Sequence, residues 1–367
     1  MPNDAANDAN IVWLKVNGTD FGGWKKVSIT AGLDRQARDF DLGVTSRWPG
    51  STDVPRRIRP FDACQVLIGS DLVLTGSVDA TPINYDGRSL SVGVKGRSKT
   101  ADLVDCSAVN EPGQWKNVRV EVIVRALLAF YGVELVVEVD TGPPVSDFQI
   151  DQGETVFDAI DRLISARGLL CTDDGRGRAV LTRTGKARAS TPLVFGDNIL
   201  SGDAPLDWKD RYSEYRIKGQ ATGDDANHTA SVNALAVETD RGVPRRRVLI
   251  KKQTGDASPA TARLEARWEA ANRAGKSLKA TYAVQGWRQQ DGSLWRPNML
   301  VRVSDPVVGF DDDLLIGEVT YSLDDSGMVC RLTVAPPGAW ELKPEQQDKS
   351  KSAALQPRPG ETVVTVP

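Results

Sequence analysis

Apolar and polar residues alternate along several short stretches of the chain. Residues 64–68 and 90–94 each carry apolar side chains at every second position. Successive side chains of a β-strand point to opposite faces, so this period of two predicts half-buried strands. The dipeptides Asn17-Gly18 and Asp86-Gly87 predict tight turns between strands, because such pairs tolerate positive φ angles. The pattern therefore favours antiparallel β-structure over much of the chain.

Three segments have the helical period instead. In residues 120–128 apolar side chains recur at i, i+3, i+4, i+7 and i+8, which predicts an amphipathic helix. A second helix is predicted to begin at Thr155, which forms a capping-box-like pair with Asp158 and is followed by a hairpin over 169–182. The third is predicted over residues 258–275, where an N-capping serine precedes a proline.

An internal repeat organises the chain. Each copy has an Arg-Pro pair, two alternating apolar residues, a Leu-x-Gly-x-Val motif, a turn glycine and three alternating apolar residues. The first copy comprises Arg59, Pro60, Val66, Ile68, Leu74, Gly76, Val78, Gly87, Leu90, Val92 and Val94, and the second comprises Arg296, Pro297, Val301, Val303, Leu315, Gly317, Val319, Gly327, Cys330, Leu332 and Val334. The copies differ mainly by an insertion near residues 311–313. They predict two similar small β-barrels, although two unrelated antiparallel meanders would also look alike.

The predicted fold class is mainly β with an α+β insert, that is, two similar small β-barrel domains and a small α/β domain. Gly153-Glu154-Thr155, with the helix and hairpin that follow, resembles a LysM-type element and is interpreted as a piece of scaffold. The predicted segments are a first barrel over 1–100 completed by strands near 205–222, the insert over 101–190, crossover strands over 191–222, a second barrel over 223–340 with helix 258–275, and an extended tail over 341–367.

Composition and charge exclude several classes of function. The chain has 367 residues, of which 40% are hydrophobic and 26% charged, and its formal net charge is −3. This balance gives no reason to expect strong binding to nucleic acid or to a membrane surface. No apolar run approaches the ~20 residues of a membrane helix, and the first residues lack a signal-peptide pattern. The four cysteines lack zinc or thioredoxin-like spacing and are interpreted as reduced thiols, although a regulatory disulfide remains an alternative.

Nothing in the sequence singles out a catalytic, metal-binding or cofactor-binding residue. The single histidine, His228, lies in a polar segment without a neighbouring nucleophile, and no phosphate-binding or dinucleotide motif occurs. The candidates for partner interfaces are two basic clusters and a β-forming segment near the C-terminus. These residues are Arg56, Arg57, Arg59, Arg245, Arg246, Arg247, Val363, Val364 and Val366. Solvated strand ends and a frayed terminus are the alternative readings of these same residues.

The order and spacing of several segments resemble the baseplate hub protein of Mu-like contractile-tailed phages. The segments that carry the resemblance are residues 12–18, 21–24, 40–42, 212–220, 265–268, 294–303 and 314–321. The resemblance implies barrels of the tube type, with an architecture also found in type VI secretion spike proteins. It implies a homotrimer whose six barrels form a pseudo-hexameric ring joining the hexameric tail tube to the trimeric central spike around the DNA channel.

The same resemblance implies a protein of the virion, located in the tail baseplate and assembled in the host cytoplasm. Its implied partners are copies of itself, the tail tube protein, the central spike protein, baseplate wedge proteins and DNA in transit, with no catalytic residues and no cofactor. Because the total charge is near neutral despite many arginines, we expect a neutral or acidic channel and arginine clusters that face protein partners. The alternative is a tail protein that degrades the cell wall or binds peptidoglycan.

Overall fold

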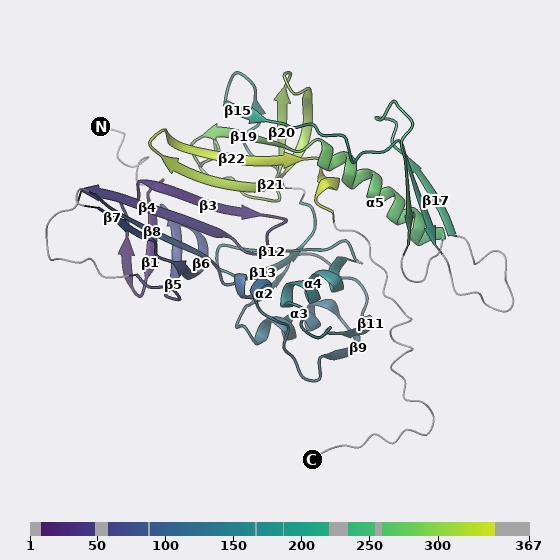
Figure 1. Cartoon of the computed structure of the whole chain (residues 1–367), viewed down its shortest axis with the longest axis horizontal. Helices are drawn as coiled ribbons and strands as arrows, with labels where there is room; N and C mark the ends of the chain where they lie inside the picture. Colours follow the sequence, from purple (N-terminus) through teal and green to yellow (C-terminus); the bar gives the residue numbers. More distant parts are fainter. Residues whose placement is uncertain are drawn as a thin grey trace, which may run out of the picture.

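The computed structural model describes residues 9–47, 58–86, 89–165, 167–185, 187–219, 234–253 and 259–341. The fold is mainly β, as the sequence predicts. The strands of this described part form one 14-stranded sheet and three small sheets. Two six-strand groups make up most of the large sheet, and we call them the first and second modules. Figure 1 shows them side by side, with a small helical insert on one side and a helix-backed sheet at the far end.

The first module is built from the N-terminal strands. Its main strands run in the order β3-β4-β8-β6-β5-β1, every neighbouring pair is antiparallel, and β2 and β7 are short additions. The bounds are β1 Val12–Val16, β2 Thr19–Phe21, β3 Lys26–Gly32, β4 Asp39–Arg47, β5 Ala63–Ile68, β6 Asp71–Ala80, β7 Ile83–Tyr85 and β8 Ser89–Ser98.

The second module combines C-terminal strands with two strands that precede them by about a hundred residues. Its order is β15-β19-β22-β21-β20-β14, antiparallel except for the short pair of β14 and β20. The bounds are β14 Leu193–Val194, β15 Ile199–Asp203, β19 Ala280–Gln285, β20 Leu300–Asp305, β21 Phe310–Asp324 and β22 Gly327–Ala335, followed by the 3₁₀ turn η1 Pro337–Ala339.

The two copies of the sequence repeat form the same meander. The first copy forms β5-β6-β8 and the second forms β20-β21-β22, and each meander is extended by two further antiparallel strands on the same side. The closed barrels predicted from the sequence are not seen, because the strand path stays open among the described residues. The first module does not close on itself since the free side of β3 pairs with β21 of the second module.

Most of the buried apolar side chains of both modules belong to one continuous core. Phe40, Leu42 and Val66 of the first module belong to the same cluster as Trp287 and Trp295 of the second. All five are 2% exposed or less, and burying large apolar side chains is the main favourable contribution to folding. The two modules therefore fold as one body.

The insert follows β8 and packs against the first module. Its helices α3 and α4 bury one face each in a core separate from that of the modules. The Thr155 hydroxyl accepts a hydrogen bond from the Asp158 backbone N–H at 3.1 Å, as the predicted cap requires. The bounds are α2 Ala101–Asp105, β9 Gln114–Val118, α3 Val120–Ala129, β10 Leu135–Val137, β11 Val145–Gln149, α4 Val156–Ser165, β12 Leu170–Asp173 and β13 Ala179–Thr182.

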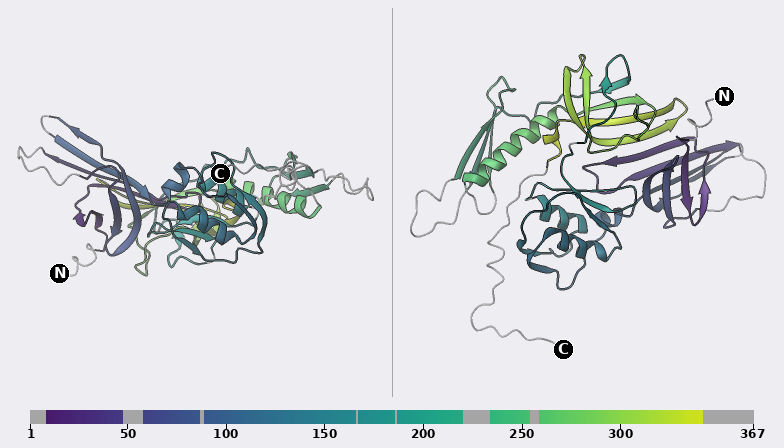
Figure 2. Two further views of the ribbon diagram at one scale, coloured as in Figure 1. Left: turned by 90° about the horizontal axis from the view of Figure 1, so that it is seen from below. Right: turned by 180° about the vertical axis from the view of Figure 1, so that it is seen from behind.

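A helix-backed sheet, which we call the lateral unit, lies beyond the second module (Figures 1 and 2). It consists of β16 Glu214–Gly219, β17 Ala234–Thr239, β18 Val248–Lys252 and helix α5 Pro259–Ser277. The sequence places strands near 205–222 in the first barrel and residues 223–340 in the second, whereas among the described strands β16 pairs with β17 and β18 and with neither module. Alternation in β16 identifies its buried face, Tyr215 and Ile217, but carries no information about the neighbouring strand. No described helix is long and apolar enough to cross a membrane.

Candidate functional site

The junction between the two modules is a row of backbone pairs. Residues 27–32 of β3 pair with residues 318–323 of β21 in antiparallel register, from Val27 opposite Leu323 to Gly32 opposite Glu318. The hydroxyls of Thr30 and Thr320 lie 3.3 Å apart across the pair. Strand β21 thus pairs with β22 on one side and with both β20 and β3 on the other. One strand belongs to both modules.

Charged side chains reinforce the end of this junction. Arg35 follows β3 and donates through Nε to Glu318 at 2.6 Å and through Nη1 to Asp39 at 2.7 Å. Burial raises the pKa of the Asp39 carboxyl, although the Arg35 guanidinium acts in the opposite direction. Arg35 therefore connects strand β21 of one module to strand β4 of the other.

The internal repeat shows which edges lack the equivalent junction. Strand β15 occupies in the second module the place that β3 occupies in the first, and its outer side is the end of the strand path. The repeat aligns Gly76 of β6 with Gly317 of β21. The residues of β6 after Gly76, together with β7, therefore correspond to residues 318–323 of β21, which pair with β3. Beyond Val78, which bonds to residues 61 and 62, no described strand pairs with that side of β6 or β7. Each module therefore has one unpaired edge, the outer side of β15 in the second module and the β6–β7 edge in the first. These two edges are the equivalents of β3 and β21, which pair with each other inside the chain.

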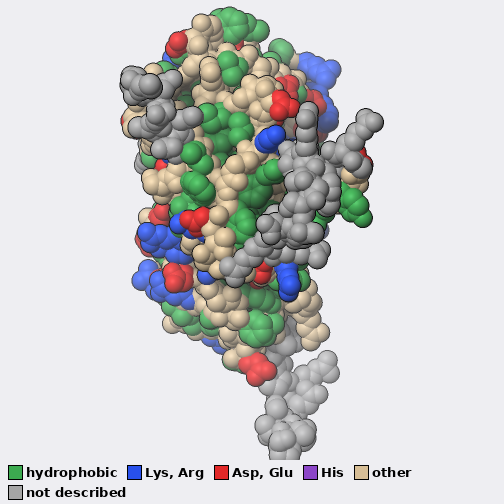
Figure 3. All heavy atoms as spheres, turned by 90° about the vertical axis from the view of Figure 1, so that its left-hand side faces the viewer, with side chains coloured by type: hydrophobic (Ala, Val, Ile, Leu, Met, Phe, Trp, Pro, Cys, Tyr) green, Lys and Arg blue, Asp and Glu red, His purple; other side chains and the backbone are tan. Residues whose placement is uncertain are grey.

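Apolar side chains are exposed beside both open edges. Ile83 and Tyr85 of β7 are exposed, Phe61 lies at the start of the same edge, and Leu200 of β15 is exposed at the other. The end of the molecule with the first module faces the viewer in Figure 3, where hydrophobic side chains gather in patches between charged ones. Exposed apolar residues beside an unpaired sheet edge are typical of a surface that a partner covers.

A buried ion pair fixes the insert to the first module. Arg38 donates through Nε to Asp173 Oδ1 at 3.0 Å and through Nη1 to the Val73 carbonyl at 3.0 Å. The Thr100 hydroxyl and the Arg38 backbone N–H also donate to Asp173, whose side chain is 1% exposed. Burial raises the pKa of Asp173, and Arg38 acts in the opposite direction.

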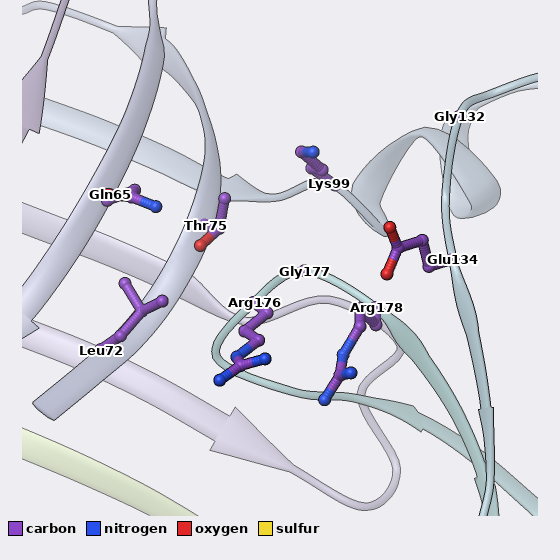
Figure 4. Close-up of a pocket in the computed structure, with 9 residues that line it drawn as sticks. All are labelled: Gln65, Leu72, Thr75, Lys99, Gly132, Glu134, Arg176, Gly177 and Arg178. Atoms are coloured by element: carbon purple, nitrogen blue, oxygen red, sulfur yellow. The ribbon is translucent and has the colours of Figure 1, made fainter.

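The tip of the β12–β13 hairpin lies directly on strand β6. A Cβ atom at Gly175 would lie 2.4 Å from the Leu72 carbonyl oxygen, and one at Gly177 would lie 2.6 Å from that of Thr75. Only glycine permits this approach. A pocket of about 380 Å³ opens beside the tip, and Lys99, Glu134, Arg176 and Arg178 are among the residues that line it (Figure 4). The lining carries charges of both signs, and the Arg178 guanidinium is already bound to Asp174.

The described residues contain no group of side chains that could hold a metal ion. Cys64, Cys171 and Cys330 are free, buried thiols, and burial raises the pKa of each, to about 12 for the first two. A thiol with a raised pKa is a poor nucleophile at neutral pH. Cys106 is half-buried and also free.

The structure separates the interface residues predicted from the sequence. Arg59 is exposed at the turn before β5, and Arg245 and Arg246 are exposed before β18. Arg247 lies over the Tyr212 ring and donates to the Lys209 carbonyl, so its guanidinium supports the fold of the lateral unit. Arg56, Arg57, Val363, Val364, Val366 and His228 lie outside the described residues. The open edges of β15 and β7 are not among the predicted residues, because alternation identifies a strand but not its unpaired side.

Three family models match successive parts of the chain. Residues 11–98 match the N-terminal domain of the Mu phage baseplate assembly protein GpP-like family, residues 100–183 the second domain of the baseplate hub protein gp44-like family, and residues 258–343 the fourth domain of the Mu phage baseplate assembly protein GpP family. The baseplate hub protein gp44 of Escherichia phage Mu is 34% identical over 353 residues, which span 94% of this chain and 92% of gp44. The chain belongs to the Mu-like baseplate hub family.

Solved structures agree with this assignment. The 43 kDa tail protein of prophage MuSo2 from Shewanella oneidensis has a TM-score of 0.83 at 33% identity, covering 90% of this chain and 99% of that one. A tail protein from Neisseria meningitidis MC58 has a TM-score of 0.75 at 23% identity, covering 91% and 98%, which shows the shared fold. A type VI secretion component shares the fold at lower identity. Baseplate hub proteins are structural components of the phage tail and not enzymes, as the sequence predicts.

Proposed function

We propose that three copies of this hub protein form a ring of six modules that joins the hexameric tail tube to the trimeric central spike. The observation that carries the proposal is the repeated strand order, with one junction made inside the chain and one matching edge left open on each module. The β15 edge of one copy would pair with the β6–β7 edge of the next. Repeating this contact around a threefold axis pairs the β15 edge and the β6–β7 edge of every copy, which is how closed assemblies avoid aggregation through free strands.

In this proposal each open six-strand module acts as one barrel-type unit of the ring, and the LysM-like insert acts as a scaffold outside it. One face of the ring would contact the tail tube protein and the other the central spike protein, with baseplate wedge proteins around the outside. DNA would pass through the central channel. A neutral or acidic channel lining would favour passage, because a basic lining would bind phosphates. Assembly would take place in the host cytoplasm before the virion is complete.

The mass of the purified full-length protein tests the ring. We expect a species of three times 39.8 kDa, measured by native mass spectrometry. Replacing Leu200 or Tyr85 by Glu places a charge beside one of the two proposed edges and should lower the fraction of trimer. Leu264→Glu is the matched control, because Leu264 is as exposed as Leu200 (57% and 56%) but lies on α5. A wild-type monomer or hexamer, or a control variant that dissociates as much as the edge variants, would refute the proposed ring.

A further inference from the structure

The lateral unit has one covered face and one open face. Helix α5 packs its Ala262 and Ala266 against Ile217 and Ala236, which lie on the inner face of the sheet. In Figure 1 no drawn helix or strand lies on the opposite side of these three strands. The strand registers place nine residues on that open face, in three rows across β17, β16 and β18. The rows are Thr239, Glu214 and Val248; Val237, Arg216 and Ile250; and Leu235, Lys218 and Lys252.

Apolar side chains lie across the open face, and one of its ends is basic. Leu235, Val237 and Ile250 are 56%, 48% and 54% exposed, so nothing in the described chain covers them. Lys218 and Lys252 are exposed at one end of the sheet. The only acidic side chain of the face, Glu214, is bound to Arg216 at 2.6 Å, and its pKa is lowered by that hydrogen bond. The face therefore offers apolar contact together with positive charge that no described acidic side chain neutralises.

The size of the face limits what can cover it. Strands lie about 4.8 Å apart, so the two outer strands are separated by about 10 Å. The strands have five or six residues, a length of about 17–20 Å. An area of about 200 Å² is far below the ~800 Å² that each partner contributes to a stable protein–protein interface. It matches the footprint of a single helix, whose diameter is about 10 Å.

Helix α5 already covers the inner face of this sheet with its apolar side chains. A second helix on the open face would bury the exposed apolar side chains there in the same way. We propose that the open face of the lateral unit binds one amphipathic helix with acidic flanks, supplied by a partner protein. The apolar stripe of this helix would cover Val237 and Ile250, and its carboxylates would face Lys218 and Lys252. The proposal depends on the lateral unit alone and not on the ring.

Nucleic acid fits this face less well. Phosphates would pair with the lysines, but they would leave the apolar side chains uncovered, and the nine residues of the face include no aromatic side chain on which a base could stack. Burial of Val237 and Ile250 contributes to affinity only if the ligand is itself apolar along one side. Charge and apolarity together therefore select a protein helix over DNA.

Two synthetic peptides test the proposal on the full-length protein. Both are amphipathic helices of about five turns with the same leucine stripe, one flanked by Glu and the other by Lys. Fluorescence anisotropy should show the Glu peptide binding at least about tenfold more tightly than the Lys peptide, a difference that shrinks at high salt. The double variant Val237→Ser/Ile250→Ser should lose at least about tenfold in affinity for the Glu peptide. Leu264→Ser, on the outer side of α5, should leave it unchanged.

Other ligands of the open face would give different results in these measurements. Equal binding of the two peptides, or an equal loss in Leu264→Ser, overturns the proposal. Displacement of the Glu peptide by a short DNA duplex would assign the face to nucleic acid. A change in native mass in the Val237→Ser/Ile250→Ser variant would show that a second copy covers it. The peptide-binding measurement does not use the native mass of the wild-type protein, which tests the ring. Either proposal can therefore fail while the other stands.

Discussion

Replacing Asp173 by Asn should loosen the attachment of the insert to the first module. The carboxylate accepts hydrogen bonds from Arg38 Nε at 3.0 Å, from the Arg38 backbone N–H at 3.2 Å and from the Thr100 hydroxyl at 3.3 Å. The variant is nearly isosteric, but it leaves the guanidinium of Arg38, whose side chain is only 20% exposed, without its counter-charge. Removing one partner of a buried pair costs about 3–5 kcal/mol, and the partial exposure of Arg38 places the expected cost near about 3 kcal/mol.

The neighbouring residue supplies a matched control. Asp174 pairs with Arg178 at 2.6 Å, but both side chains are more exposed, at 25% and 32%. Asp174→Asn should therefore cost less than about 1 kcal/mol. The assays are urea unfolding and hydrogen exchange, which should show faster exchange in residues 170–182 of Asp173→Asn and unchanged exchange in the second module. Adding Arg38→Met to Asp173→Asn should restore part of the loss, because the unpaired charge is then removed.

Equal losses in the Asp173 and Asp174 variants would refute this reasoning, since burial would then make no difference. So would exchange that rises evenly over the whole chain, because the pair would not be specific to the insert.

Three further predictions address packing, pH and thiol chemistry. Gly317→Ala should lower the free energy of unfolding in urea by about 1–3 kcal/mol, because the new Cβ would lie 2.0 Å from the Trp340 ring. The control is Gly43→Ala, whose Cβ would lie 3.4 Å from Lys26 Cβ and which should lower it by less than about 1 kcal/mol. The hydrogen bonds from Arg211 lower the pKa of Asp240 in the folded protein. The ionised carboxylate therefore stabilises the fold at pH values above its unfolded pKa of about 3.9. This contribution is lost as the pH falls through the lower pKa of the folded state. Asp240→Asn should therefore have a flatter dependence of stability on pH in this range, and parallel curves for wild type and variant would contradict it. A thiol reagent at pH 8 should modify Cys106 alone in the folded protein and all four cysteines in urea; rapid labelling that persists in Cys106→Ser would show that a buried thiol is accessible.

The sequence predicts the features that depend on residues close to one another along the chain. The spacing from each turn glycine to the following apolar residues identified β8 and β22 as equivalent strands, and the cap at Thr155 located the start of α4. The junction of β3 with β21 could not be predicted, because the period of two in β3 shows that the strand is half-buried but not which strand, about 290 residues away, lies beside it. The same ambiguity led β16 to be assigned to the first barrel. For the interface, the sequence identified exposed arginines, whereas an unpaired strand edge has no signal of its own in residue type.

The shared strand β21 also has a mechanical consequence. Because its backbone bonds hold β20, β22 and β3 at once, tilting one module against the other requires these bonds to break together. A force applied along the strands would load them in shear, the direction in which many bonds resist simultaneously. The two modules are thus expected to move as one rigid body, and in the ring proposed above any bending would fall at the contacts between copies.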